Sequence, residues 1–177
     1  MNRWTIPDII PDKTIGEVLK LYHGGFGWVI HPVERPAKGG KKPLTKGWKK
    51  LESSFLTEEL AKEYFHCDPP YNIGCVIRPP HVVIDLDSKQ DDGESVLKWL
   101  SGQPELVSIP RERTAGGAHI HVRCDDLPVF KKAGGKPYEK ALVATLNDQV
   151  TAELYFDGLN LVLAPSTHEN GHIYRWD

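Results

Sequence analysis

The sequence predicts a single-domain protein of the α/β (α+β) class, and three features of its 177 residues support this prediction. Several short stretches alternate between apolar and polar side chains, which is the period of a half-buried strand. Amphipathic stretches that follow capping residues predict short helices between these strands. No internal repeat, linker or low-complexity segment divides the chain, and its length suits one domain with its own core. Residues 1–177 are therefore interpreted as one domain.

The N-terminal third is expected to form a helix, a buried strand and a second helix. Residues 14–17, Thr-Ile-Gly-Glu, have the pattern of a capping box and predict a helix to residue 22. The apolar run 26–31 before Pro32 predicts a buried strand. Thr57 is expected to cap a second helix, because two glutamates follow it in the favourable first turn. This helix is predicted to end near Phe65.

The rest of the chain alternates between predicted strands and two predicted helices. The expected strands cover residues 73–77, 81–86, 106–109, 118–124, 150–156, 159–164 and 173–176, and the expected helices cover 92–100 and 138–147.

Two carboxylates lie together at the end of the strand expected at 81–86. In an extended chain Asp85 and Asp87 project from one face, while Ile84 and Leu86 project from the other. Neighbouring carboxylates repel each other unless a cation lies between them, so this pattern favours a hard divalent metal such as Mg²⁺ or Mn²⁺. The alternative is a strand that ends in a solvated turn at Asp87.

The strand expected at 118–124 has one chemically equipped face. His119, His121 and Arg123 alternate with apolar residues, so all three are predicted to project from the same side. Gly116 and Gly117 before them allow backbone N–H groups to approach an anion, and imidazole can donate a hydrogen bond to phosphate. The alternative is that both histidines are structural.

A third carboxylate and a basic segment complete the candidate chemistry. Glu153 is expected to project from the strand at 150–156, whereas Asp157 and Gly158 predict a turn. Residues 31–50 hold seven Lys or Arg and one acidic residue, Glu34. Such a segment can bind phosphates, or it can be a solvated loop.

The composition excludes several classes of protein. A net charge of −2 does not indicate a plain duplex-binding protein. Cys67, Cys75 and Cys124 are odd in number and far apart, which argues against a disulfide framework and a structural zinc site. The chain has no apolar run of membrane-spanning length and no secretory leader, so no membrane partner and a cytoplasmic location are expected.

Taken in order, these motifs resemble the bifunctional primase-polymerase (prim-pol) domains of the archaeo-eukaryotic primase (AEP) superfamily. The resemblance rests on Asp85-Leu86-Asp87, on Gly-Gly-x-His at 116–119, on the carboxylate strand and on the Pro-Ser-x-His motif from Pro165. It covers roughly residues 27–176. It implies the AEP-type primase fold, in which an RRM-like antiparallel sheet packs against an N-terminal αβ unit. The implied activity is nucleotidyl transfer by a DNA primase or DNA-directed polymerase.

The resemblance also implies roles for individual residues. Asp85, Asp87 and Glu153 match the catalytic carboxylates that hold two Mg²⁺ or Mn²⁺ ions, although the family more often has Asp at the third position. Gly117 stands where a Ser is common, which removes a hydroxyl from the expected phosphate cradle. The residues expected at the incoming nucleotide are His119, Arg113, Lys42, Ser166 and His168.

The implied partners are dNTP or NTP substrates and a single-stranded DNA template with its primer. Family members often continue into a primase C-terminal region or a helicase, which would make this chain the N-terminal part of a longer replication protein from a phage or other mobile element.

Two other functions remain open at this point. The His-hydrophobic-His pattern at His119 and His121 is shared with rolling-circle-type HUH endonucleases, whose covalent mechanism would need Tyr138 as the nucleophile. A non-catalytic nucleotide- or nucleic-acid-binding relic is the second alternative, favoured by the missing Ser and the short chain.

Overall fold

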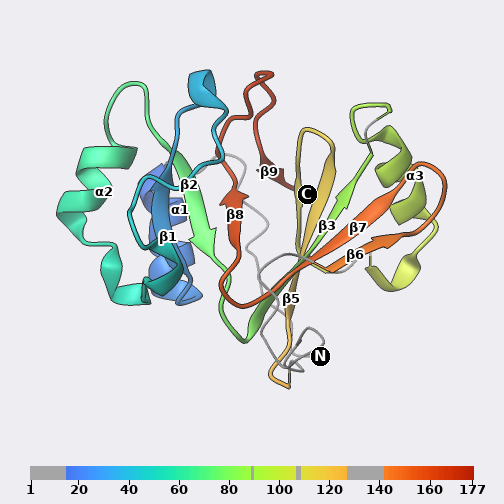
Figure 1. Cartoon of the computed structure of the whole chain (residues 1–177), viewed down its shortest axis with the longest axis horizontal. Helices are drawn as coiled ribbons and strands as arrows, with labels where there is room; N and C mark the ends of the chain where they lie inside the picture. The colour runs from blue at the N-terminus through green and yellow to red at the C-terminus, as the bar shows by residue number, and fades with distance from the viewer. Residues whose placement is uncertain (1–14, 89, 107–108, 127–141) are drawn as a thin grey trace.

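Two antiparallel sheets lie side by side in the computed structural model, which describes residues 15–88, 90–106, 109–126 and 142–177 (Figure 1). The expected α+β class with an antiparallel sheet is confirmed. None of the helices in these ranges is long and apolar enough to cross a membrane.

The first sheet has three strands in the order β1-β2-β8. Its outer strand β1 passes through Pro32, which an edge strand tolerates because one side of it needs no ladder hydrogen bonds. The elements of this half are α1 (Ile15–Leu19), the π-helical η1 (Lys20–Gly25), β1 (Val29–Val33), α2 (Glu58–Phe65), β2 (Asn72–Val76) and β8 (Asn160–Leu163). Short 3₁₀ helices η2 (Pro36–Lys38), η3 (Trp48–Lys50) and η4 (Ser53–Phe55) lie in the connection between β1 and α2.

The second sheet has six strands in the order β6-β7-β3-β5-β4-β9. The strand that carries the paired aspartates, β3, lies near its centre between β5 and β7. The elements are β3 (His81–Asp87), α3 (Glu94–Ser101), the 3₁₀ helix η5 (Pro104–Leu106), β4 (Arg111–Arg113), β5 (Gly117–Arg123), β6 (Leu142–Thr145), β7 (Thr151–Tyr155) and β9 (Arg175–Trp176).

Two apolar clusters cover the two faces of the second sheet. The cluster beside α3 includes Leu86, Val96 and Ile120, each buried. The larger cluster lies between the sheets, where the Tyr22 hydroxyl donates to the backbone oxygen of Ala164 at 2.8 Å and accepts from Trp176 Nε1 at 2.6 Å. The face of the second sheet that lies opposite α3 therefore points at the first sheet. Polar side chains on that face lie at the junction of the two sheets.

Several boundaries differ from the sequence prediction. The first strand begins at Val29 instead of Phe26, because the end of the preceding helix still accepts hydrogen bonds from the N–H groups of Phe26 and Trp28. The strand predicted at 106–109 is wrong at Leu106, which ends η5, and at Ile109, which lies in a bend; residues 107–108 lie outside the described part of the chain, and the next strand is β4. The helix predicted at 138–147 is wrong over 142–145, which pair with β7 as β6, and its first residues lie outside the described part of the chain.

Candidate active site

A row of polar side chains crosses the second sheet on the face that meets the first sheet. Asp85 on β3 is directly opposite His119 on β5 and Glu153 on β7. His119 is in turn opposite Glu112 on β4. Because directly paired residues project from the same face, these four side chains form one line, and Asp87 lies two residues along β3 on the same side.

A cavity of about 550 Å³ opens beside this row. Its walls are formed by β3, by the turn before β5 and by the segments that follow β1 and β8. The lining residues include Lys41, Asp85, Asp87, Ser88, Thr114, Gly116, His119, Tyr155, His168 and Tyr174. A volume of this size suits a small ligand, and the convergence of several charged side chains marks the cavity as the leading candidate site among the described residues.

Asp85 carries an unfavourable negative charge at the wall of this cavity. Burial raises the pKa of its carboxyl; His119 opposes that rise, while Asp87 and Glu153 add to it by repulsion. The side chain of Asp85 nevertheless remains 22% exposed, so a ligand can reach it. A partly exposed carboxylate that is repelled by neighbouring carboxylates is suited to binding a cation.

His119 is held between two carboxylates. Its Nε2 lies 3.7 Å from Asp85 Oδ1, and its Nδ1 lies 3.1 Å from Glu112 Oε2. Burial opposes a charge on the ring, but Asp85 and Glu112 outweigh this effect and raise the pKa of His119. The imidazole is therefore protonated more readily than a free imidazole, and a protonated imidazole can donate to a phosphate oxygen.

Two groups of side chains have the donor atoms for a metal ion. Asp85, Asp87 and Glu153 offer only carboxylate oxygens, which suit a hard ion such as Mg²⁺ or Mn²⁺. Burial is the main cause of the raised pKa of Asp85, and repulsion from Asp87 and Glu153, which a cation would relieve, adds to it. Glu112, His119 and His121 have ligand atoms that all lie within 4.8 Å of one another. This buried group can hold a metal, and its mixed N and O donors suit a transition ion.

Glycine at positions 116 and 117 is required by the close packing of the turn before β5. A Cβ at Gly116 would lie 1.9 Å from Asp87 Oδ1, and one at Gly117 would lie 2.1 Å from the backbone oxygen of Leu86. Gly93, with φ of +84°, packs against the same turn. A Ser at position 117 has no room here, so the absence of the family's hydroxyl follows from how closely β3 and the turn approach each other.

Three predicted nucleotide-binding residues lie away from the cavity walls. Arg113 follows Glu112 on β4 and is opposite Ala118, so alternation turns its side chain to the α3 face of the sheet. Lys42 is 79% exposed and lies 3.9 Å from Glu34. Ser166 is buried, and its Oγ accepts a hydrogen bond from the N–H of Ile73 at 2.8 Å, which ties the segment after β8 to β2.

The other predicted residues lie at or beside the cavity. Asp85, Asp87, His119 and His168 line it, and Glu153 accepts a hydrogen bond at 3.3 Å from the hydroxyl of Tyr155, which lines it too. Asp157 lies in the turn after β7 and pairs with Arg78 at 2.8 Å, away from the acidic row. The candidate nucleophile of the endonuclease alternative, at position 138, lies outside the described residues.

Sequence reasoning missed Glu112 and Lys41. Glu112 is fully buried between two arginines of a three-residue strand, where no periodic pattern marks it. Lys41 lines the cavity, whereas its neighbour Lys42 does not. Because this loop has no regular alternation of side chains, the sequence does not predict which of the two lysines faces the cavity. Tyr155 and Tyr174 also line the cavity, and neither was assigned to the site from the sequence.

The fold and the site together define a class: an α+β protein whose central antiparallel sheet presents carboxylates and a histidine to a polar cavity. The model of the family described as bifunctional DNA primase/polymerase, N-terminal (Prim-Pol), matches residues 20–177. Since this match covers most of the chain, the protein belongs to the Prim-Pol family. Comparison with curated proteins found no similar sequence. Family membership supports nucleotidyl transfer of the primase or polymerase type, with nucleotide substrates and a nucleic-acid template.

Proposed function

We propose that this domain transfers nucleotides onto a primer strand, directed by a single-stranded DNA template and assisted by two Mg²⁺ or Mn²⁺ ions. The observation that carries the proposal is the line of Glu153, Asp85 and His119 across three paired strands, with Asp87 beside it. Three carboxylates that can hold metal ions and one readily protonated imidazole lie on a single face, as a metal-bound triphosphate requires. Family membership supports the same type of reaction.

Asp85, Asp87 and Glu153 would hold the metal ions. When bound, the ions would supply Lewis acidity at the reacting phosphate and lower the pKa of the attacking 3′-hydroxyl. The protein's own contribution is to fix the carboxylates on a rigid sheet, where the β-ladder limits their movement. The Tyr155 hydroxyl donates to Glu153 Oε2 at 3.3 Å and so restrains one of them further.

The cationic side of the cavity would hold the triphosphate. His119 donates from the centre of the sheet, while Lys41 and His168 reach the cavity from opposite connections. The side chain of Lys41 is exposed, so it can change conformation to contact a bound ligand. The side chain of His119 is only 6% exposed and is held in place by its neighbours. We assign the phosphate-binding role of the basic segment to Lys41 in place of Lys42, because Lys42 is paired with Glu34.

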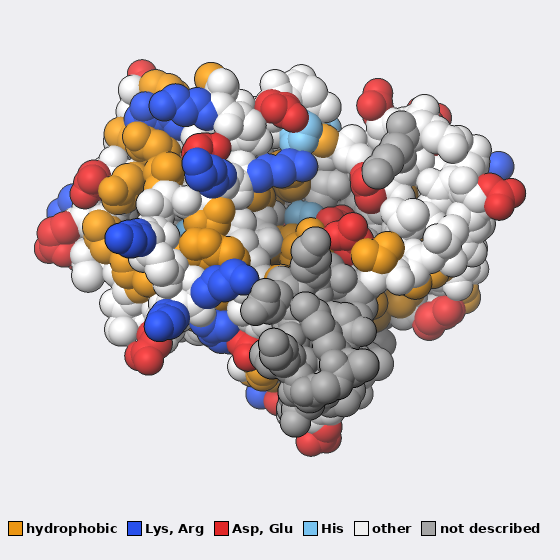
Figure 2. Space-filling model, in the orientation of Figure 1, with side chains coloured by type: hydrophobic (Ala, Val, Ile, Leu, Met, Phe, Trp, Pro, Cys, Tyr) orange, Lys and Arg blue, Asp and Glu red, His pale blue; other side chains and the backbone are white. Residues whose placement is uncertain are grey.

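The template and primer would lie over the basic half of the molecule. Figure 2 shows Lys and Arg side chains concentrated over the half that holds β1, β2 and β8, with acidic side chains near the middle of the same face. The connection between β1 and α2 supplies six exposed lysines to the surface of this half: Lys38, Lys41, Lys42, Lys46, Lys49 and Lys50. Because Lys41 belongs both to this surface and to the cavity, a strand bound to the lysines would lead directly to the acidic row.

The direct test is extension of a labelled primer on a single-stranded template with dNTPs and Mg²⁺ or Mn²⁺, alongside a reaction without primer. Asp85→Asn keeps the shape of the side chain but removes a metal ligand, so transfer should fall by more than about 10²-fold. Asp126→Asn is the matched control, because this exposed aspartate lies after β5, away from the cavity. Unfolding curves should coincide for all three proteins. Transfer by Asp85→Asn within threefold of wild type would refute the proposal.

The geometry disfavours an endonuclease of the HUH type. Both histidines of such a motif must be within reach of a scissile phosphate to act on it, whereas the side chain of His121 is fully buried and does not line the cavity. A binding relic would keep nucleotide affinity without transfer, so the primer-extension assay also separates it from the proposed enzyme.

A further inference from the structure

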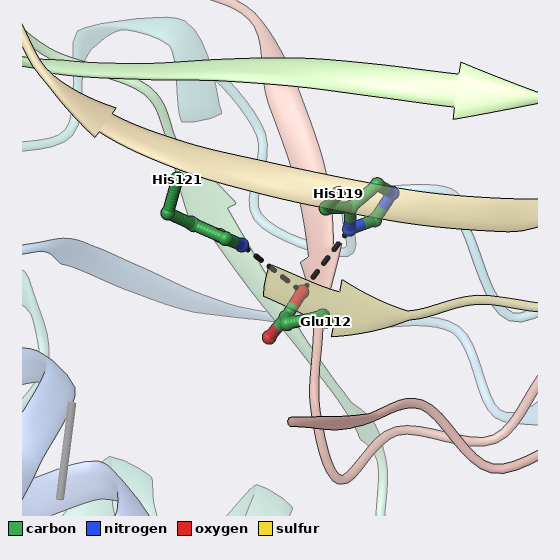
Figure 3. A group of neighbouring side chains, drawn as sticks. All are labelled: Glu112, His119 and His121. Atoms are coloured by element: carbon green, nitrogen blue, oxygen red, sulfur yellow. Dashed lines mark hydrogen bonds and ion pairs between the residues drawn. The ribbon is translucent and has the colours of Figure 1, made fainter. Parts of the chain in front are cut away.

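Glu112, His119 and His121 form a buried cluster of metal-ligating side chains beside the acidic row. Glu112 on β4 is directly opposite His119 on β5, and His121 lies two residues further along β5, so all three project from the same face of the second sheet. Glu112 and His121 have no exposed side-chain area, and His119 is 6% exposed. Figure 3 shows both imidazoles turned toward the carboxylate. Ionisable side chains are buried in this way when they are paired or when they coordinate a metal.

The ligand atoms of the buried cluster have a spacing close to that of a metal site. Glu112 Oε2 lies 3.1 Å from His119 Nδ1 and 3.3 Å from His121 Nε2, and all three atoms lie within 4.8 Å of one another. A tetrahedral ion with bonds of about 2.0–2.1 Å holds neighbouring ligand atoms about 3.3–3.4 Å apart. Two of the three separations are therefore near those of a complex, and rotation of the two rings toward each other would bring the third to the same value.

One nitrogen of the buried cluster is not satisfied by the protein alone. The Nε2 of His121 makes no hydrogen bond within the described part of the chain, although Glu112 Oε2 lies within ion-pair distance of it. The nitrogen is therefore not aligned with this oxygen as a direct hydrogen bond requires. A buried polar atom without a partner is costly, and an ion between the three side chains would satisfy it.

The atoms of Glu112 and His121 that point away from the cluster have partners of their own. Glu112 Oε1 accepts a hydrogen bond from the N–H of Ala164 at 2.8 Å, and His121 Nδ1 lies 3.0 Å from His81 Nε2. Metal ligands are held in the same way, because a partner on the far atom fixes the orientation of the ligand. Ala164 directly follows β8, so these contacts also connect the second sheet to the first.

His119 can serve the buried cluster and the cavity at the same time. Its Nδ1 faces Glu112, whereas its Nε2 lies 3.7 Å from Asp85 Oδ1 at the cavity wall. An imidazole that binds an ion through one nitrogen carries its hydrogen on the other. With an ion on Nδ1, the ring would still present a hydrogen-bond donor to a ligand in the cavity.

We propose that Glu112, His119 and His121 bind one divalent transition ion of the Zn²⁺ type, which stabilises the junction between the two sheets. Two imidazole nitrogens and one carboxylate oxygen favour such an ion over Mg²⁺, which prefers oxygen ligands and keeps several waters. Glu112 Oε1 or a water can fill the fourth position of a tetrahedral ion. This site differs from the acidic row, which offers only carboxylate oxygens.

The first measurement is the elemental content of the protein, purified without a metal-affinity tag and dialysed against buffer with Mg²⁺. One transition ion per chain should remain bound, and protein stripped with a chelator should take up one equivalent of Zn²⁺. An ion that is present in only a small fraction of chains, or that the stripped protein does not take up again, is adventitious and would overturn the proposal.

The second measurement compares the metal content of variants. Glu112→Gln should lose the transition ion, because a neutral amide oxygen is a weaker ligand than a carboxylate. Asp87→Asn is the matched control, since it removes a ligand of the acidic row and none of the buried cluster. His168→Ala removes a histidine that lines the cavity, and both controls should keep the ion. Retention by Glu112→Gln, or loss by Asp87→Asn, would place the ion elsewhere and overturn the proposal.

X-ray absorption at the edge of the bound ion needs only the wild-type protein, so it decides the matter even where Glu112→Gln does not fold. The spectrum should show two imidazole ligands and at least one oxygen ligand at about 2.0–2.2 Å. Oxygen ligands alone would assign the ion to the acidic row, and a sulfur ligand at about 2.3 Å would assign it to a cysteine. Either result would overturn the proposal.

Thermal unfolding tests whether the ion stabilises the junction. For a domain of this size, a ligand at about 1,000 times its dissociation constant raises the melting temperature by roughly 8–16 °C. A chelator should lower the melting temperature of wild type by about this amount, and Zn²⁺ but not Mg²⁺ should restore it. His121→Phe, which keeps an aromatic ring against Trp176, should not respond to the chelator. An unchanged melting temperature after removal of the ion from wild type would refute the stabilising role.

The metal site and the proposed function can fail separately. Metal content, X-ray absorption and unfolding are measured without nucleotide or DNA, so a protein that transfers no nucleotides can still bind the ion. A protein that extends primers but binds no transition ion would refute only the metal site.

Discussion

A methyl group added at Gly116 should disable the acidic row without unfolding the protein. The Cβ of Gly116→Ala would lie 1.9 Å from Asp87 Oδ1 and 3.1 Å from its Cγ. Heavy atoms of this kind do not approach within 3.0 Å, so the Asp87 carboxylate must move by more than about 1 Å. A displacement of this size at a reacting group costs about 10²-fold in rate. Because the end of a side chain can rotate away, the free energy of unfolding should change by less than about 1 kcal/mol.

The same substitution one residue later, Gly117→Ala, should instead lower the stability of the fold. The Cβ of Gly117→Ala would lie 2.1 Å from the backbone oxygen of Leu86 and 2.9 Å from Val96 Cγ2. Neither atom can move without separating β3 from β5 or shifting α3, so the substitution overpacks the core and should cost about 3 kcal/mol or more. For a domain of this size that corresponds to a fall in melting temperature of roughly 6–12 °C.

Primer extension, Mn²⁺ titration calorimetry and thermal unfolding of the two variants test this contrast. Gly24→Ala is the control, since no atom lies within 4 Å of its added Cβ, and it should leave activity unchanged and stability equal or slightly higher. If Gly116→Ala keeps both Mn²⁺ affinity and transfer within threefold of wild type, the position of the Asp87 carboxylate does not govern catalysis. Equal destabilisation by both alanines would refute the distinction between a side-chain and a backbone collision.

Three further predictions follow from the charges of the molecule. Glu153→Gln should abolish transfer and Glu153→Asp should keep part of it, whereas Asp157→Asn should be nearly neutral because Asp157 pairs with Arg78; the reverse pattern in primer extension would place the third metal ligand at Asp157. Burial, helped by repulsion from His121, holds the pKa of His81 well below its usual value, so below about pH 6.5 only the unfolded chain takes up this proton. The free energy of unfolding should therefore decrease as the pH is lowered below about 6.5, by up to about 1.4 kcal/mol per pH unit for this group. Urea titrations at several pH values should show a smaller decrease in His81→Phe, which keeps an aromatic ring against Trp28. Replacing Lys46, Lys49 and Lys50 with Gln should lower the slope of log affinity for single-stranded DNA against log salt by about 2, while Lys98→Gln on α3 should leave it unchanged; equal slopes in both variants would remove this surface as the DNA path.

Alternation along strands was sufficient to predict which side chains share a face. Asp85 and Asp87 project together from β3 as expected, and Glu153 lies directly opposite Asp85, while the turn at Asp157 and Gly158 directs Asp157 toward Arg78. The alternation of side chains along a strand depends only on local sequence, so the shared face could be predicted without knowing the strand order.

Features that depend on long-range pairing were not accessible from the sequence. The helix predicted across 142–145 became β6, because pairing with β7 outweighs the weak local preference of a short mixed segment. Arg113 was placed beside His119 along the chain, but the alternation within β4 turns it to the other face and brings Glu112 to His119 instead. The pairing of β6 with β7 and the register of β4 on β5 decided these two outcomes.

The register of the acidic row has a consequence for insertions and deletions. One residue inserted within β3, β5 or β7 turns every following side chain to the opposite face, so Asp85, His119 or Glu153 would exchange places with an apolar neighbour. The exchange would bury a charge beside α3 and remove a ligand from the cavity at the same time. Changes of chain length are therefore compatible with this domain only between strands, as at the turn 147–149 that joins β6 to β7.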